Sequence, residues 1–189
     1  AAEAQAALQK FVNSYPADAQ IDKATFKLGM AMIGQKQWDP ALAQFAKLAV
    51  MAKSEWRDNS LYRSAWAEKA AARPDKAIVH YEALLAGFPQ SQWLEASTFE
   101  LAELEFEAAK KGASAQYDAA IGRLTGLVTK TKDPSLLSKA HDKLGWCHYN
   151  KQAYDLAAKS FETVLAGQPS KALALKAAYQ AGAARYKLK

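Results

Sequence analysis

Apolar residues recur at helical spacing along the whole chain, most clearly in the stretch Lys139–Pro169. There, Leu144 and Phe161 fall on faces that would meet if two short helices packed antiparallel. Gly145 and Ala157 have almost no side chain, so two helix backbones can approach closely at these points. The stretch therefore predicts a helix–turn–helix pair.

The small residue of the second helix in this pair recurs along the chain, at steps of 37, 36, 43 and 37 residues. It is followed four residues later by a bulky residue, and three residues after that by another. The small residues are Ala4, Ala41, Ala77, Ala120 and Ala157. The bulky residues are Leu8, Phe45, Tyr81, Leu124 and Phe161, followed by Phe11, Leu48, Leu84, Leu127 and Val164.

The first helix of the pair carries an independent marker, a two-residue packing site. Its copies are Leu28-Gly29, Ser64-Ala65, Leu101-Ala102, Leu144-Gly145 and Ala181-Gly182. The steps between its small members are 36, 37, 43 and 37 residues, so both markers follow nearly the same rhythm. The longer step reflects six or seven extra residues around 108–116, which we expect in a loop.

This periodicity predicts helices at 1–14, 20–34, 38–52, 58–72, 74–87, 91–110, 115–131, 134–150, 153–167 and 170–188. Asp39-Pro40 and Asp133-Pro134 suit an N-cap followed by the first helical residue. Gly167 suits a left-handed helix end before Pro169.

Leu144, Gly145, Ala157, Phe161 and Pro169 carry the pattern of the tetratricopeptide repeat, which this chain resembles over nearly its whole length. His141 and His148 stand where the family usually has Trp and Tyr. The resemblance implies an all-α, right-handed solenoid of antiparallel helix pairs, about ten helices in all. It divides the chain into a half repeat 1–17, repeats 18–53, 54–90, 91–132 and 133–169, and a half repeat 170–189.

The repeat endings Leu8–Pro16, Tyr81–Pro89 and Phe161–Pro169 are similar to those of the bacterial cell-envelope branch of the family. That branch includes Tol–Pal-associated and outer-membrane-assembly lipoproteins. The similarity favours the periplasm or cell envelope over the cytoplasm. The half repeats suggest a fragment of a longer array, or ends that meet a partner.

The resemblance also implies a concave groove, lined by the first helices, that binds a peptide or protein segment. Transferring the family's groove positions gives Phe26, Met30, Ile33, Asn59, Tyr62, Trp66, Lys69, Phe99, Glu103, Phe106, Lys139, Asp142, Trp146, Tyr149, Lys176, Tyr179 and Ala183. Phe26 and Met30 occupy two places that the family's carboxylate-clamping members fill with Lys or Asn, so an apolar or mixed peptide is favoured over an acidic tail.

Some of these aromatic residues have an alternative role in packing against the next repeat, chiefly Phe26, Tyr62, Phe99 and Tyr179. Trp38 aligns with Tyr117 and Tyr154, which favours packing at the turn. Trp56 and Trp93 lie at helix starts and turns, and the sequence leaves open whether they make capping contacts or contacts on the convex face.

The composition of the chain disfavours several classes of function. The net charge is +6, but the basic residues are dispersed and do not form the stripe typical of nucleic-acid binding. No apolar run is long enough to span a bilayer, and no targeting signal is visible. The single cysteine excludes an intrachain disulfide and leaves the redox compartment open.

Catalytic motifs are not found, so we expect no enzymatic activity and no cofactor. A metal site at His141, Cys147 and His148 is disfavoured, because adjacent helical residues point about 100° apart. His80 is expected to point outward. Glu103, Glu105 and Glu107 spread around their helix, which favours a solvated flank over acid–base chemistry.

We therefore predict a non-catalytic protein–protein interaction scaffold with a protein or peptide partner. The alternative is a structural assembly subunit that packs through terminal and convex surfaces against copies of itself or a larger complex.

Overall fold

The computed structural model describes residues 2–167 and 169–189, and every regular element in this part of the chain is an α-helix. The predicted helical fold class is confirmed, with boundaries close to those expected. The helices are α1 (Ala2–Ser14), α2 (Ile21–Gly34), α3 (Trp38–Ala49), α4 (Arg57–Ala70), α5 (Pro74–Gly87), α6 (Leu94–Lys110), α7 (Gln116–Val128), α8 (Pro134–Asn150), α9 (Tyr154–Ala166) and α10 (Lys171–Tyr186).

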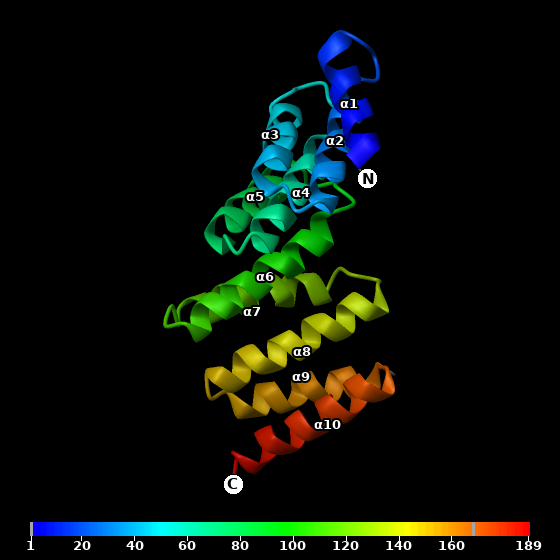
Figure 1. The fold of residues 1–189 in the computed structure, drawn as a ribbon. Helices are drawn as coiled ribbons and strands as arrows, with labels where there is room; N and C mark the ends of the chain where they lie inside the picture. The colour runs from blue at the N-terminus through cyan, green and yellow to red at the C-terminus, as the bar shows by residue number, and fades with distance from the viewer. Residues whose placement is uncertain (1, 168) are drawn as a thin grey trace. The chain divides into compact units, whose positions relative to one another are not determined.

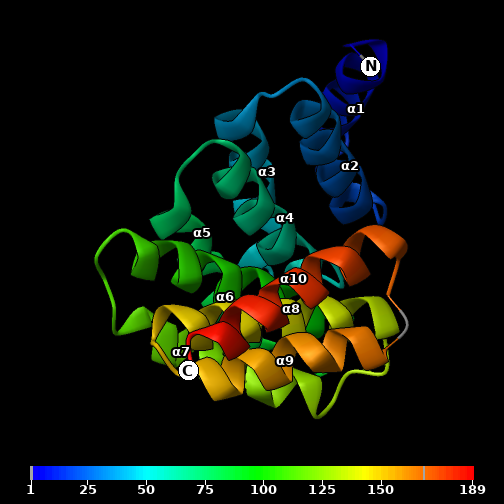
Figure 2. The same cartoon turned by 90° about the horizontal axis from the view of Figure 1, so that it is seen from below.

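The chain divides into two compact units, Ala1–Ser97 and Thr98–Lys189. In the first unit α1 packs on α2, α2 on α3, α3 on α4 and α4 on α5. In the second unit α7 packs on α8, α8 on α9 and α9 on α10, as Figures 1 and 2 show. Within each unit these helices pack on their neighbours in sequence, which is the arrangement of a helical repeat array.

In two helix pairs, an aromatic ring of the second helix packs into the space left by a glycine of the first helix, which we call a glycine notch. Phe45 of α3 is fully buried over Gly29 of α2, and Phe161 of α9 is fully buried over Gly145 of α8. A Cβ added at Gly29 would lie 2.6 Å from the Phe45 ring, and one added at Gly145 would lie 2.6 Å from Cζ of Phe161. Real Cβ atoms do not approach this closely, so only glycine fits at these two positions.

The turns between first and second helices share one backbone conformation. Lys36, Ala72 and Gln152 all have φ near +60°, and Gly112 has φ of 117°. The amide that follows each of these residues donates to a carbonyl five residues back, for example Gln37 to Met32 at 3.0 Å. This is the Schellman ending, which satisfies carbonyls that the helix leaves free.

Helix ends depart from the sequence expectations in two places. Asp133 caps α8 as predicted, accepting hydrogen bonds from the amides of Ser135 at 2.8 Å and Leu136 at 3.3 Å. Asp39 lies inside the first turn of α3, so its predicted N-cap role is wrong. Gly167 ends α9 with φ of −75°, so the predicted left-handed ending is also wrong.

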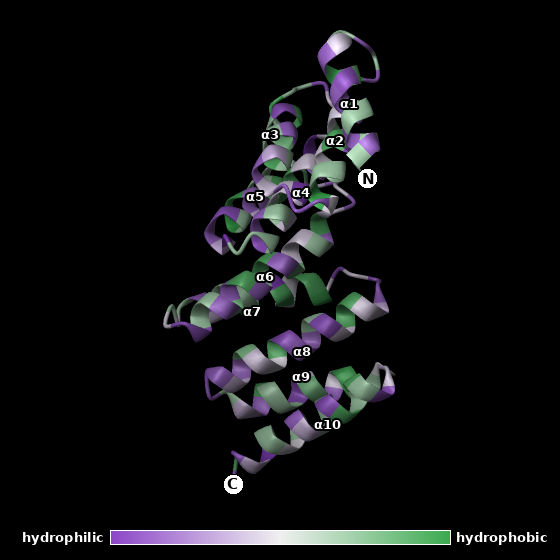
Figure 3. Cartoon of the chain, viewed as in Figure 1, coloured by the Kyte–Doolittle hydropathy of each residue, from purple (hydrophilic) through white to green (hydrophobic). Residues whose placement is uncertain are grey.

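Hydrophobic and hydrophilic residues alternate along each helix (Figure 3). The buried hydrophobic residues form several cores. The first unit is centred on Phe26, Leu28, Met32, Ile33, Ala41, Phe45, Leu48 and Ala67. One core of the second unit joins Phe106, Tyr117 and Leu124 to Leu144, and another joins Phe161 to Ala181 and Ala184.

The glycine notch makes a stability prediction. Gly145→Ala should lower the free energy of unfolding by about 2 kcal/mol, because overpacking a buried ring outweighs the gain in helix propensity. Gly182→Ala in α10 is the matched control: among the described residues nothing lies within 4 Å of a Cβ placed there. It should raise stability by up to about 1 kcal/mol. Urea unfolding at low protein concentration, followed by circular dichroism, measures both, and equal effects would contradict the notch.

Candidate functional site

Two tryptophans hold equivalent positions on first helices, each directly after the small packing residue. Trp66 follows Ala65 on α4, and Trp146 follows Gly145 on α8. The side chain of Trp66 is 39% exposed, and its ring lies edge-on to Trp38 of α3 with centroids 6.1 Å apart. The first unit therefore presents a partly exposed pair of indoles.

Trp146 is half-buried and held by contacts on several sides. Its ring packs edge-on against Tyr149 and against Phe161, each with centroids 5.8 Å away. Its indole N–H lies 2.8 Å from the side-chain oxygen of Gln180, in the amide orientation that also lets Gln180 donate to Asp142 at 3.1 Å. These contacts fix the direction of the indole before any ligand arrives.

Asp142 links this network to a charge on the next first helix. Lys176 of α10 donates to Asp142 at 2.9 Å, so Lys176, Asp142, Gln180 and Trp146 form one chain of hydrogen bonds. The structure thus brings together three residues that the sequence selected. It adds Gln180, which sequence reasoning missed because a lone buried amide carries no motif.

Three of the expected groove residues are core residues in the structure. Phe26, Ile33 and Phe106 are buried, so their side chains are not available to a ligand. Phe26 packs against Trp56 with ring centroids 4.6 Å apart and against Phe45 at 5.6 Å. Of the two alternatives left open for Phe26, packing is the one the structure shows.

Tyr62 and Asn59 are covered in the same way by the residue that precedes the next first helix. Trp93 stacks on Tyr62 with centroids 4.3 Å apart and donates from its indole nitrogen to Asn59 at 2.6 Å. The guanidinium of Arg63 lies 5.2 Å from the centre of the Trp93 ring. Trp56 and Trp93 are therefore contacts between successive repeats, which the sequence had left open.

The second unit shows a weaker version of this cover. Phe99 and Leu136 are both half-buried against the same core. Glu103 pairs with Lys143 at 3.1 Å. Asp142 pairs in the same way with Lys176. Both acidic residues expected to line the groove are therefore paired with a lysine on the next first helix.

The other expected positions keep more access to solvent. Met30, Lys69 and Tyr149 are half-buried, and Ala183 is too. Lys139 is exposed, and Tyr179 is 79% exposed. The accessible part of the predicted set thus lies mainly past the first turn of each helix.

The histidines and the cysteine lie in or beside packing positions. Cys147 is fully buried, and burial raises the pKa of its thiol to about 12. His141 and His148 are half-buried, and burial lowers the pKa of both. Among the described residues no group of three or more His, Cys, Asp or Glu side chains could hold a metal ion.

One expectation about the carboxylates of α6 is wrong. Glu105, expected on a solvated flank, is only 5% exposed and pairs with Arg123 at 2.7 Å. Glu68 holds the equivalent position on α4 and pairs with Arg73. His80, expected to point outward, is half-buried, and burial lowers its pKa.

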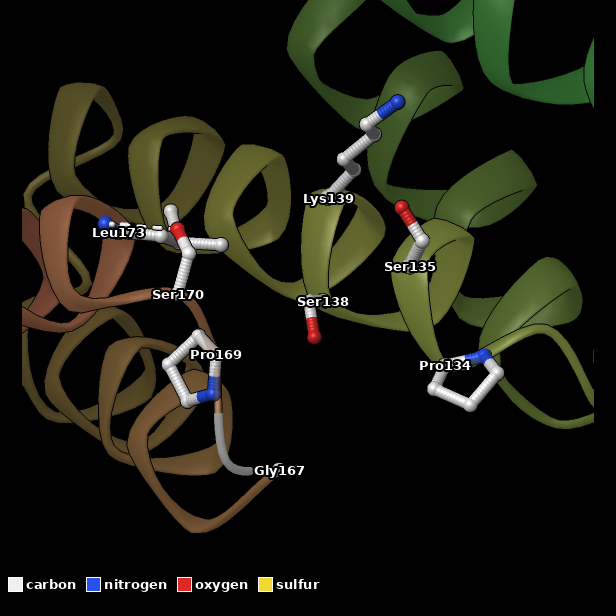
Figure 4. A pocket seen from close by; sticks show the side chains of 8 residues that line it. All are labelled: Pro134, Ser135, Ser138, Lys139, Gly167, Pro169, Ser170 and Leu173. Atoms are coloured by element: carbon white, nitrogen blue, oxygen red, sulfur yellow. Dashed lines mark hydrogen bonds between the residues drawn. The ribbon is translucent and has the colours of Figure 1, made fainter.

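A pocket of about 350 Å³ lies where α8 and α10 begin (Figure 4). Ser135 and Lys139 point to one side of it, whereas Ser138 points to the other. The polar groups therefore do not converge on one ligand. Its walls are Pro134, Ser135, Ser138, Lys139, Gly167, Pro169, Ser170 and Leu173.

The helix pairs, their glycine notches and their first-helix aromatics are the features expected of tetratricopeptide repeats. The family model for the tetratricopeptide repeat matches residues 23–50 and 59–91. The match and the fold support this family. No curated protein sequence matches the chain. None of the described helices is long and apolar enough to cross a membrane.

Solved structures share the fold at low sequence identity. The crystal structure of MamA is 17% identical, covering 90% of this chain and 92% of MamA with a TM-score of 0.68. YrrB, described as a TPR protein with an unusual peptide-binding site, is 18% identical over 94% of this chain and 84% of its own, with a TM-score of 0.68. A tetratricopeptide repeat protein from Parabacteroides merdae is 15% identical over 97% and 69%, with a TM-score of 0.70.

The buried thiol predicts low reactivity. Cys147 should react with iodoacetamide at neutral pH at least about a hundredfold more slowly in the folded chain than in denaturant, because the thiolate is the nucleophile and burial disfavours it. Val79→Cys in a Cys147→Ala background provides an exposed control thiol. Mass spectrometry of the alkylated chain gives both rates, and equal rates would show that Cys147 is accessible.

The buried carboxylate makes a second prediction. Arg123→Met should lower the free energy of unfolding by about 2 kcal/mol or more, because the charge on buried Glu105 loses its partner while the apolar stem is kept. Lys110→Met breaks the exposed pair with Glu107 and should cost under about 0.5 kcal/mol. Urea unfolding compares the two, and similar costs would mean that Glu105 is stabilised by other contacts.

Proposed function

We propose that the chain is a non-catalytic interaction module that binds a polypeptide segment on the first-helix surfaces around Trp66 and Trp146. The observation that carries the proposal is the partly exposed indole at the same repeat position in each unit. A tryptophan gives a large contact area at low entropic cost, which is why this residue dominates many binding interfaces. The proposal does not depend on how the two units are placed relative to each other.

The surroundings of the two indoles favour a segment with apolar or aromatic side chains. Trp66 lies beside Trp38, and Trp146 lies beside Tyr149. Nearby acidic side chains at Asp142 and Glu103 already pair with lysines. An apolar anchor on these rings would gain contact without having to break an ion pair first.

Preorganisation supports the Trp146 surface in particular. Its indole is oriented by Gln180, which is itself held by Asp142. A side chain fixed in advance loses less conformational entropy on binding. The fold shared with YrrB, whose name records a peptide-binding site, adds support for the class of partner but not for the residues.

The bacterial cell-envelope branch remains a proposal resting on the repeat endings at Leu8–Pro16, Tyr81–Pro89 and Phe161–Pro169. Fractionation of the native source, with the chain detected by antibody, would place it in or outside the envelope.

The test uses a phage-displayed library of random linear peptides, panned on the purified chain, followed by calorimetric titration of the enriched peptides. Trp66→Ala or Trp146→Ala should weaken the peptides that bind at that surface by about tenfold or more. The loss follows from removing the anchor ring and its desolvated contact area.

Val79→Ala is the matched control, because Val79 is an exposed apolar residue on the second helix α5. It should leave every dissociation constant unchanged. Unchanged affinity in both folded tryptophan variants, or failure to enrich any peptide, would overturn the proposal.

A further inference from the structure

Arg63 of α4 is a cation on the same side of the helix as Trp66. It precedes Trp66 by three residues, and residues at this spacing are neighbours on a helix surface, with Cβ atoms about 5–6 Å apart. Its side chain is half-buried, so water solvates the charge only in part. Within the described part of the chain, Arg63 contacts aromatic rings and forms no ion pair.

Two aromatic rings hold the guanidinium of Arg63 in place. Its carbon lies 5.2 Å from the centre of the Trp93 ring and 5.5 Å from the centre of the Tyr62 ring. A cation–π contact uses the flat face of the group, so the N–H donors along its edge remain for other partners. The Nε atom is shielded from solvent and has no hydrogen-bond partner among the described residues. The group is therefore oriented by its neighbours while its charge stays uncompensated.

The acidic residues of α4 itself are engaged elsewhere. Asp58 and Glu68 each lie five residues from Arg63. Asp58 accepts a hydrogen bond from the hydroxyl of Ser91 at 2.6 Å and another from the backbone amide of the next residue at 2.7 Å. Glu68 is buried and pairs with Arg73. Both carboxylates of the helix therefore serve other groups.

The second unit shows how the same repeat position is neutralised within the chain. Lys143 of α8 is the equivalent of Arg63 and precedes Trp146 by three residues. It pairs at 3.1 Å with Glu103, which lies on the preceding first helix. The position equivalent to Glu103 on α2 is Met30, which carries no charge. The carboxylate that α6 supplies to Lys143 therefore has no counterpart on α2 for Arg63.

We propose that the segment bound at Trp66 carries an aspartate or glutamate side chain that pairs with Arg63, close to the apolar group that contacts the indole. This inference rests on the proposed function and names the chemistry of its ligand at one of the two surfaces. A carboxylate matches the planar edge of a guanidinium and can accept two hydrogen bonds from it. The Trp146 surface, whose lysine is already paired, should have no such preference.

A peptide microarray provides the first test. Random linear peptides with amidated C termini are probed with the labelled chain and with its Trp66→Ala and Trp146→Ala variants. Amidation leaves side chains as the source of carboxylates. Peptides whose binding requires Trp66 should be enriched in Asp and Glu relative to the whole array, whereas peptides whose binding requires Trp146 should not.

Calorimetric titration of single peptides then measures the pairing. Changing the acidic residue of a Trp66-dependent peptide to its amide should weaken binding by about fivefold or more, because a partly desolvated, charge-assisted hydrogen bond is lost. Arg63→Met, which keeps much of the apolar stem, should cause a similar loss. The two changes together should cost no more than either alone, because each removes the same pair.

Lys27→Met is the matched control, because Lys27 holds the same repeat position on α2 and is exposed. An exposed charge of this kind contributes little, so the change should alter each dissociation constant by less than about twofold. Circular dichroism checks that the variants are folded. The substitution in the peptide needs no change in the protein, so it tests the pair even where Arg63→Met is poorly folded.

Trp66-dependent peptides without enrichment in acidic residues would overturn this inference and leave the proposed function standing. Additive effects of Arg63→Met and of the amide substitution would do the same, because they would show that the two groups do not meet. An array on which no peptide depends on either tryptophan would overturn the proposed function, and this inference with it.

Discussion

The contact on which the structure depends is a bulky side chain of a second helix set against a residue with little or no side chain on the first. Phe45 over Gly29 and Phe161 over Gly145 bring two helix backbones as close as a ring allows. The same positions hold Tyr81 and Leu124 elsewhere, and all four bulky residues are fully buried. Close packing of this kind fixes the distance between the two helices of a pair, and so fixes the shape of the surface on which the next helix packs.

A second set of contacts joins one repeat to the next. Trp56 covers Phe26, and Trp93 covers Tyr62, in each case from just before the following first helix. Polar links do the same at the exposed edge, where Arg73 reaches Asp39 and Arg185 reaches Asp155. The exposed ion pairs add little energy, so the aromatic contacts contribute more to the stability between repeats.

These contacts explain why only some of the residues expected to line the groove remain accessible. The residues near the start of each first helix are closed over by the next repeat, whereas Trp66 and Trp146, one turn further on, keep part of their rings free. Charged side chains are also satisfied within the units, since buried Glu68 and Glu105 each pair with an arginine of the same unit.

The sequence by itself determined the helical class, the helix boundaries to within about three residues and the notch at Gly145, because these follow from periodicity and from the size of single side chains. It could not determine the turn at Lys36, Ala72 and Gln152, because none of these residues signals a left-handed backbone. Nor could it determine that Glu105 is buried or that Gln180 orients Trp146. Those outcomes depend on which side chain of another helix arrives at a given point, and a residue's own spacing does not contain that information.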